Sequence, residues 1–135
     1  MKNWEEEHRL RSARKYAQLA VIVPLWGLLF TLMVYRYIAR LSPYDRRMVS
    51  QAIAWQIIMN MIHALFWSFI LGVSFIYEGR WAFAGTLMGL IALVIWILLF
   101  FVGIFMGLIA ANSVEKNEEF RYPIISGLRR YRQPR

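Results

Sequence analysis

The stretch SPYDRRMVSQAIAWQIIMNMIHALFWSFILGVSFIY, residues 42–77, decides the fold. Its first four residues predict a helix start. Ser42 can cap free backbone amides, Pro43 suits the first helical position, and Asp45 completes an S-x-x-D box. The next turn signal is the Glu-Gly pair at 78–79. An ideal helix of this length measures roughly 50 Å, against about 30 Å for a hydrocarbon core, so its first two turns should stand in the headgroup layer.

A polar stripe lies in the middle of this apolar helix. Gln56, Asn60, His63 and Trp67 are separated by four, three and four positions, which places them on one helical face. Polar groups at this depth have to face something other than lipid. The stripe therefore predicts contact with another helix, a partner subunit or a polar ligand.

The composition indicates one small integral membrane domain. The chain has 135 residues, 59% of them apolar and 18% charged, compared with about 45–50% and 25% in soluble domains. The apolar residues form three runs, each long enough to cross a bilayer. We expect an all-α protein with a polar helical arm at 1–16, spans at about 17–38, 43–77 and 81–113, and a basic tail at 114–135. Cysteine is absent, which excludes disulfides, thiolate catalysis and cysteine-ligated zinc or iron–sulfur sites.

The third span carries two small-x-x-x-small pairs. All four glycines share one face, because the pairs are 18 residues apart, or five helical turns. Such faces allow helices to approach closely. We therefore predict helix-packing roles for Gly85, Gly89, Gly103 and Gly107.

The net charge of +8 is confined to the chain ends and the first loop. Basic residues flanking membrane spans attract anionic lipid headgroups, and no nucleic-acid-binding motif accompanies them. The predicted headgroup or partner contacts are Arg46, Arg47, Arg121, Arg129, Arg130 and Arg132. Three spans would put the termini on opposite sides. Since the first loop and the tail carry the larger basic set, the positive-inside rule predicts the N-terminus outside and the C-terminus inside, in a bacterial inner membrane or an organelle of bacterial origin.

Two short motifs suggest a family. The segment AIAWQI at 52–57 resembles the A-L-N-F-Q-I segment that opens the second span of the Tic-twenty-like small membrane proteins. The segment EFRYPII at 119–125 is similar to the E-Y-Y-R-Y-P-L segment after their last span. The resemblance implies a three-span fold. Because the chloroplast relative is a component of a protein-import channel, it also implies a role in translocation.

His63 is the ionisable side chain near the middle of a predicted span, and three roles are open to it. It can bond to a neighbouring helix, bond to a partner subunit or lipid headgroup, or ligate the metal of a haem or chlorophyll. Beyond the two headgroup turns of the second span, the spans contain no aspartate or glutamate that could act as a base or ion relay. We therefore predict a protein that is not an enzyme and binds no resident metal.

Three functions follow from these observations. The first is an accessory or structural subunit packed with other integral subunits, for example in a respiratory or photosynthetic complex. The second, implied by the resemblance, is a component of protein translocation or transport. The third is a haem- or chlorophyll-binding subunit that uses His63.

Overall fold

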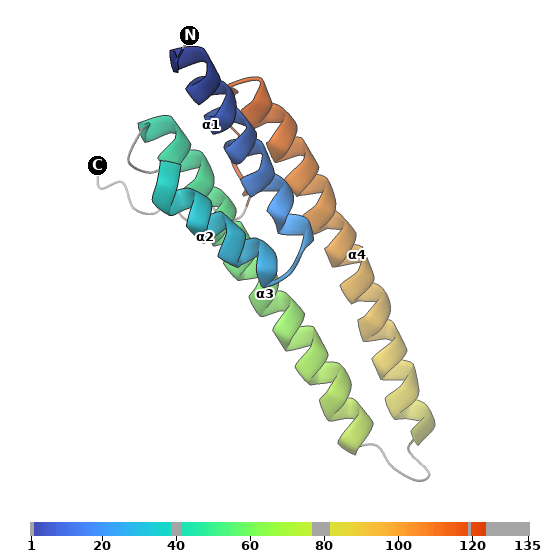
Figure 1. Cartoon of the computed structure of the whole chain (residues 1–135). Helices are drawn as coiled ribbons and strands as arrows, with labels where there is room; N and C mark the ends of the chain where they lie inside the picture. Colours follow the sequence, from blue (N-terminus) through green and yellow to red (C-terminus); the bar gives the residue numbers. More distant parts are fainter. Residues whose placement is uncertain (1, 39–41, 77–81, 119, 124–135) are drawn as a thin grey trace, which may run out of the picture.

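The computed structural model describes residues 2–38, 42–76, 82–118 and 120–123. It contains four α-helices and one short 3-10 turn (Figure 1). The helices are α1 (Lys2–Leu19), α2 (Trp26–Ile38), α3 (Pro43–Ile76) and α4 (Ala82–Glu115), and the turn η1 (Ala20–Ile22) follows α1. These described ranges contain no strand, which confirms the all-α prediction.

The two long helices, α3 and α4, form an antiparallel pair of 34 residues each (Figure 1). Both are long and apolar enough to cross a membrane. The helix start predicted at Pro43 is present, and the Arg46 amide donates to the Ser42 carbonyl at 3.1 Å. Just after the end of α4, which lies beside the start of α3, Asn117 adopts the left-handed conformation, with φ of 59°. Asparagine tolerates this geometry and is a common terminator of helices.

The first apolar run does not form the single span predicted at 17–38. Instead, α1 ends at Leu19, the chain reverses over residues 20–25, and α2 runs back beside α1 (Figure 1). Within the reversal, Val23 is extended and Leu25 has a φ of 61°. The run therefore folds into a helical hairpin, α1–η1–α2, instead of the single continuous helix predicted for 17–38.

Two residues explain why the run bends at this point. Pro24 has no backbone N–H to continue a helix. Gly27 allows the two arms of the hairpin to touch, because a Cβ built there would lie 1.8 Å from the carbonyl oxygen of Ala20. A larger residue at 27 would hold the arms apart.

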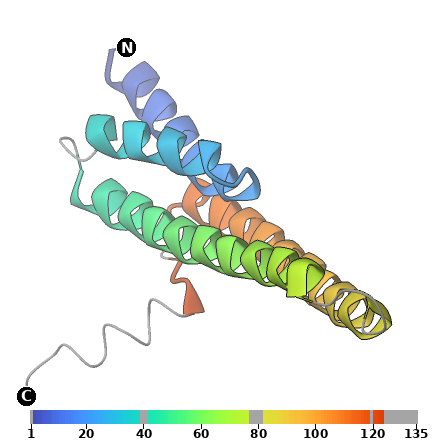
Figure 2. The ribbon, with the colours of Figure 1, turned by 90° about the horizontal axis from the view of Figure 1, so that it is seen from below.

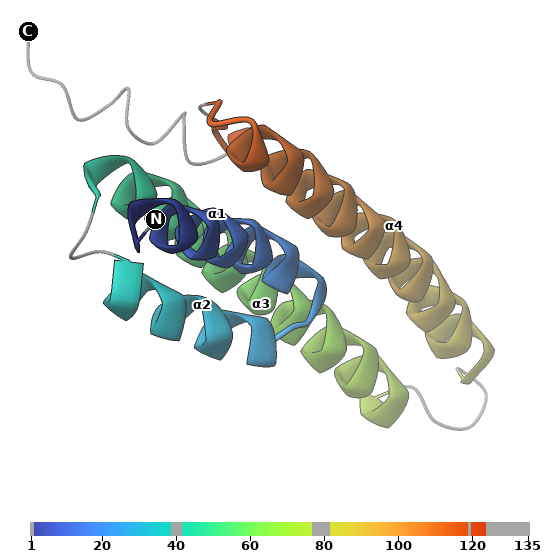
Figure 3. The same ribbon diagram turned by 45° about the horizontal axis from the view of Figure 1, so that its top comes forward.

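The hairpin covers only part of the α3–α4 pair (Figures 2 and 3). Its tip reaches Asn60 of α3, whose side-chain oxygen accepts a hydrogen bond from the Leu25 amide at 3.1 Å. The molecule thus has a four-helix half, made of α1, α2, residues 43–60 and residues 101–115. It also has a two-helix half, made of residues 61–76 and 82–100. Helix α1 contacts all three other helices, and α2 contacts α1 and α3.

The beginning of the chain and the end of α4 lie at the same end of the molecule (Figure 1). Lys15 of α1 is 2.8 Å from Glu115 of α4, as measured between Nζ and Oε2. This contradicts the prediction that the N-terminus and the tail lie on opposite sides. The physical reason is the hairpin, which returns the chain to its starting side before α3 begins.

Candidate functional site

A buried ion pair joins α1 to the start of α3. Arg14 Nη1 donates to Asp45 Oδ1 at 2.7 Å, and the two side chains are only 9% and 4% exposed. The same guanidinium donates from Nη2 to Asn117 Oδ1 at 3.3 Å and lies over the Tyr44 ring, 5.4 Å from its centroid. Arg14 of α1 therefore bonds to the start of α3 and to the segment that follows α4.

The segment after α4 folds back into this end of the molecule through Tyr122, which is 1% exposed. Its hydroxyl donates to Gln18 Oε1 at 2.6 Å, and Gln18 Nε2 donates to the Met48 carbonyl at 3.2 Å. The Tyr122 ring stacks on Trp55, with centroids 5.0 Å apart. Burial raises the pKa of the Tyr122 phenol above its ordinary value. We call Arg14, Gln18, Asp45, Trp55 and Tyr122 the junction.

A second polar cluster lies where the hairpin crosses α3. Gln56 Nε2 donates to Thr31 Oγ1 at 2.7 Å, and Thr31 Oγ1 donates to the Gly27 carbonyl at 2.8 Å. Both side chains are fully buried, at 2% and 0% exposure. The Ala17 carbonyl is 3.4 Å from Thr31 Oγ1. The cluster therefore joins α1, α2 and α3 through buried hydrogen bonds, although Gln56 Oε1 has no hydrogen-bond partner among the described residues.

The predicted polar stripe divides between two neighbours. Gln56 and Asn60 face the hairpin, and Asn60 satisfies the Leu25 amide that the chain reversal leaves without a helical partner. His63 and Trp67 face α4 instead, where both rings contact Trp96. The stripe is thus a helix-contact surface along its whole length.

His63 forms a defined hydrogen bond in the two-helix half. Its Nδ1 accepts from Trp96 Nε1 at 2.9 Å. The ring also contacts Phe100, with centroids 5.9 Å apart. A neutral imidazole that accepts at one nitrogen carries its proton on the other. The tautomer that fits this geometry therefore has its proton on Nε2, the nitrogen that a metal would otherwise use.

The four glycines of α4 differ in their surroundings. A Cβ at Gly103 would lie 3.0 Å from Met59 Cε, and one at Gly107 would lie 3.2 Å from the Gln18 carbonyl oxygen. At Gly89 a Cβ would meet no atom within 4 Å. Gly85 is buried, and with Gly89 it lines a groove between α3 and α4. Close helix approach is thus present at Gly103 and Gly107, and the packing role predicted for Gly89 does not fit this geometry.

Three of the predicted headgroup contacts belong to the described residues. They lie at the end of the molecule where α3 begins and α4 ends, which we call the charged end (Figure 1). Arg46, Arg47 and Arg121 are exposed there, and Arg46 Nε donates to the Tyr35 hydroxyl at 3.3 Å. Arg129, Arg130 and Arg132 lie outside the described residues.

Sequence reasoning missed the hairpin cluster and most of the junction. Arg14 was assigned to a solvated arm and Asp45 to a capping box, although the two form one buried pair. A usable signal was the spacing of Gly27 and Thr31, which is itself a small-x-x-x-small pattern. In the part of the chain that the structure describes, no three His, Cys, Asp or Glu side chains gather to hold a metal ion. The arrangement is suited to fastening helices.

Two long apolar helices, with the described charged side chains at one end, define a small integral membrane protein. A family model for the magnetosome magnetite crystal formation protein family (MamF/MmsF) matches residues 11–129. The chain belongs to this family. Comparisons with curated proteins and with solved structures gave no match.

This membership corrects the Tic-twenty-like resemblance, which was wrong. The matched residues 11–129 include both motifs on which the resemblance was based, and they belong to a different family. Each motif is only six or seven residues long. The structure shows what the motifs do in this chain, because Trp55 of the first stacks on Tyr122 of the second. The implied link to an import channel falls with the resemblance.

Proposed function

We propose that this chain is a non-enzymatic accessory protein of the magnetosome membrane that supports magnetite crystal formation. The observation that carries the proposal is the family match over residues 11–129. The two long apolar helices support the membrane location. Their outer faces expose large apolar side chains such as Phe83, Phe101 and Phe105, which suit lipid or other integral subunits.

A structural role is supported by the way in which the polar groups are used. In the junction, Arg14 is paired with Asp45, and Tyr122 with Gln18. A catalytic nucleophile or base needs a free lone pair directed at a substrate, whereas these groups bond to one another across helices. His63 fits the same scheme, since its Nδ1 is bonded to Trp96 and joins α3 to α4.

We propose that both termini face the cytoplasm, in place of the N-terminus outside. The described basic residues belong to α1, the end of α2, the start of α3 and the segment around the end of α4. These parts of the backbone lie at the charged end of the molecule (Figure 1). The positive-inside rule then assigns this end to the cytoplasm. Arg36, Arg46, Arg47, Lys116 and Arg121 are exposed there and are placed to meet anionic headgroups.

The orientation is tested with single cysteines in this cysteine-free chain. Glu5→Cys and Lys116→Cys should both react with a membrane-impermeant maleimide only after the cytoplasmic face is opened. Phe83→Cys lies at the opposite end and reports the other side. Labelling of Glu5→Cys and Lys116→Cys from opposite sides would refute the proposed orientation.

The function is tested by in-frame deletion in a magnetite-forming host, followed by complementation. We expect the deletion to change crystal size or number, as measured by electron microscopy, and the wild-type chain to restore both. The complementing protein should be recovered in the magnetosome membrane fraction. Gly27→Leu should fail to restore the crystals, whereas the matched variant Gly89→Leu should succeed. Unchanged crystals in the deletion strain would overturn the proposal.

A further inference from the structure

The two halves of the molecule have unequal cross-sections. The hairpin tip bonds to Asn60, which lies 15 positions after Asp45 and 16 before Ile76. These separations correspond to about 22 Å and 24 Å along an ideal helix. The hairpin therefore ends near the middle of the α3–α4 pair. In a bilayer, four helices would occupy one leaflet and two the other.

The part of the hairpin between Lys15 and Arg36 is suited to hydrocarbon and not to water. No charged residue occurs between Lys15 and Arg36. The outward side chains of the tip and of α2 are large and apolar, with Trp26 74% and Met33 73% exposed. The backbone polar groups at the reversal are satisfied internally, by Asn60 and by the Gly27 amide bonding to Val23. Irregular backbone is tolerated within a bilayer under this condition.

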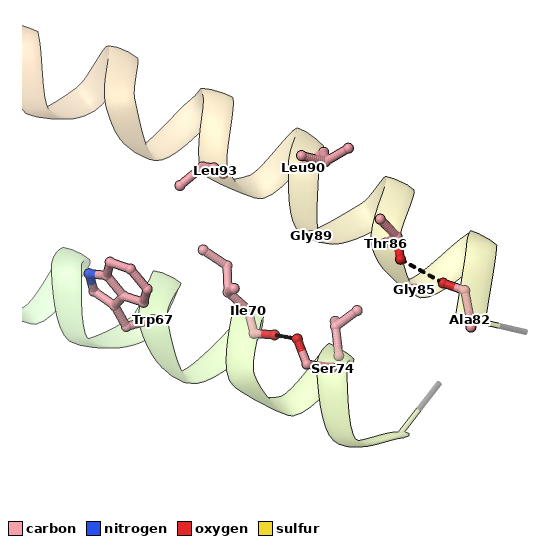
Figure 4. A pocket seen from close by; sticks show the side chains of 10 residues that line it. Trp67, Ile70, Ser74, Ala82, Gly85, Thr86, Gly89, Leu90 and Leu93 are labelled. Carbon is pink, nitrogen blue, oxygen red and sulfur yellow. Dashed lines mark hydrogen bonds between the residues drawn. The ribbon is translucent and has the colours of Figure 1, made fainter. Parts of the chain in front are cut away.

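The two-helix half is narrow and exposed on its outer sides. Phe75 is 77% exposed and Phe83 80% exposed. Between α3 and α4 lies a groove of about 440 Å³, whose lining includes the small residues Ser74, Gly85 and Gly89 (Figure 4). Gly89 borders this groove, and a Cβ there would touch nothing within 4 Å. The two halves therefore differ in cross-section, because the hairpin ends beside Asn60 and does not extend along the two-helix half.

We propose that the protein is a membrane wedge that favours bilayers curved so that the leaflet on the side of the termini is convex. Two additional helices of roughly 10 Å diameter add about 160 Å² to that leaflet. A convex leaflet has more area per molecule at its surface, so it accommodates the wider half with less compression of lipid. The exposed arginines at this end, Arg36 and Arg46 among them, hold it at an anionic surface.

The wedge is tested with the full chain in giant vesicles of phosphatidylcholine with a minority of phosphatidylglycerol. A membrane tube drawn outward from the vesicle has a convex outer leaflet. Glu5→Cys allows the two orientations to be read separately. In one experiment, an impermeant maleimide dye added to the vesicles labels only molecules with their termini outside. In a second experiment, all molecules are labelled before reconstitution, and an impermeant quencher is then added outside. Only molecules with their termini inside remain fluorescent. The readout is the ratio of protein to lipid dye in the tube, divided by the same ratio in the vesicle.

We expect this ratio to exceed one for molecules with their termini outside and to fall below one for molecules with their termini inside. Equal ratios for the two orientations, or the opposite signs, would overturn the wedge. Gly27→Leu should change the difference, because it forces the hairpin arms apart and alters the cross-section of that half, and Gly89→Leu should leave it as in the wild type. The wild-type comparison decides the proposal by itself if Gly27→Leu does not insert.

The wedge rests on the membrane location within the proposed function and on no role in crystal formation. The two can therefore fail separately. A sorting ratio above one with the termini outside and below one with the termini inside, together with unchanged crystals in a deletion strain, would support the wedge and refute the proposed function. Altered crystals together with equal sorting ratios for the two orientations would support the proposed function and refute the wedge.

Discussion

Replacing Gly27 by alanine should be among the most damaging single-methyl additions in the described chain. The added Cβ would lie 1.8 Å from the Ala20 carbonyl oxygen and 2.8 Å from its carbon. Both atoms belong to the backbone, so no side-chain rotation can relieve the clash. Because non-bonded heavy atoms prefer roughly 3.5 Å or more, the hairpin arms would have to separate by about 1.7 Å.

The cost follows from what this separation breaks. Overpacking in a close-packed site costs about 1–3 kcal/mol. Moving α2 also strains the bonds of Thr31 to Gln56 and to the Ala17 carbonyl, now 2.7 and 3.4 Å long. Alanine gains back at most about 1 kcal/mol in helix propensity. We expect a net loss of about 3 kcal/mol in the free energy of unfolding.

The measurement is reversible unfolding of the purified protein in mixed micelles, followed by tryptophan fluorescence and far-ultraviolet circular dichroism. Gly89→Ala is the matched control, since a Cβ there meets no atom within 4 Å. It adds the same methyl to a helix and should be neutral or slightly stabilising. Equal stability of Gly27→Ala and Gly89→Ala would refute the close crossing of the hairpin arms.

Three further predictions concern the junction and His63. Tyr122→Phe removes one buried hydrogen bond and should cost about 1 kcal/mol in micelle unfolding. Burial raises the pKa of Tyr122 in the folded state. The contribution of this phenol to the free energy of unfolding is therefore fully present below the ordinary pKa of about 10 and decreases as the pH rises above it. Tyr122→Phe should remove this decrease in stability at alkaline pH. Asp45→Asn leaves Arg14 buried without its counter-ion and should cost about 3 kcal/mol, whereas Lys15→Ala at the solvent-exposed pair with Glu115 should have a much smaller effect, both measured by the same unfolding assay. His63→Leu should cost about 0.6 kcal/mol, the average for a hydrogen bond in a membrane, and leave the visible absorption spectrum of the purified protein unchanged.

Each of these predictions has an outcome that would contradict it. An alkaline stability profile identical in wild type and Tyr122→Phe would mean that the phenol is accessible to water. Equal effects of Asp45→Asn and Lys15→Ala would mean that burial does not distinguish the two ion pairs. Loss of a haem or chlorophyll band in His63→Leu, with the protein still inserted, would replace the structural role of His63 by ligation.

The long helices were predictable from sequence to within two residues at each end. The predicted 43–77 and 81–113 compare with Pro43–Ile76 and Ala82–Glu115. These boundaries are set by local signals, namely a capping residue, a proline and an uninterrupted apolar run. A local pattern reports such features because the responsible atoms lie within one or two turns.

The hairpin and the junction were not predictable in this way. Apolar length counts residues but not direction, so residues 17–38 satisfied the rule for a span although the chain reverses within them. The junction depends on pairs that are distant in sequence, with 31 positions between Arg14 and Asp45 and 104 between Gln18 and Tyr122. No periodicity within a single helix encodes such contacts. The same hairpin changes the count of basic residues on each side, because it brings α1 to the end of the molecule where α3 begins.

The return of Tyr122 to α1 has a consequence for biosynthesis. The residue that completes the junction is made 104 positions after its partner Gln18. During translation α1 and the start of α3 must therefore wait in the membrane with Gln18 and Trp55 uncovered until nearly the whole chain has left the ribosome. A product truncated before residue 120 would keep these groups exposed, which makes it a target for the proteases that clear incomplete membrane proteins. The junction can therefore close only after α4 and the segment that follows it have been made.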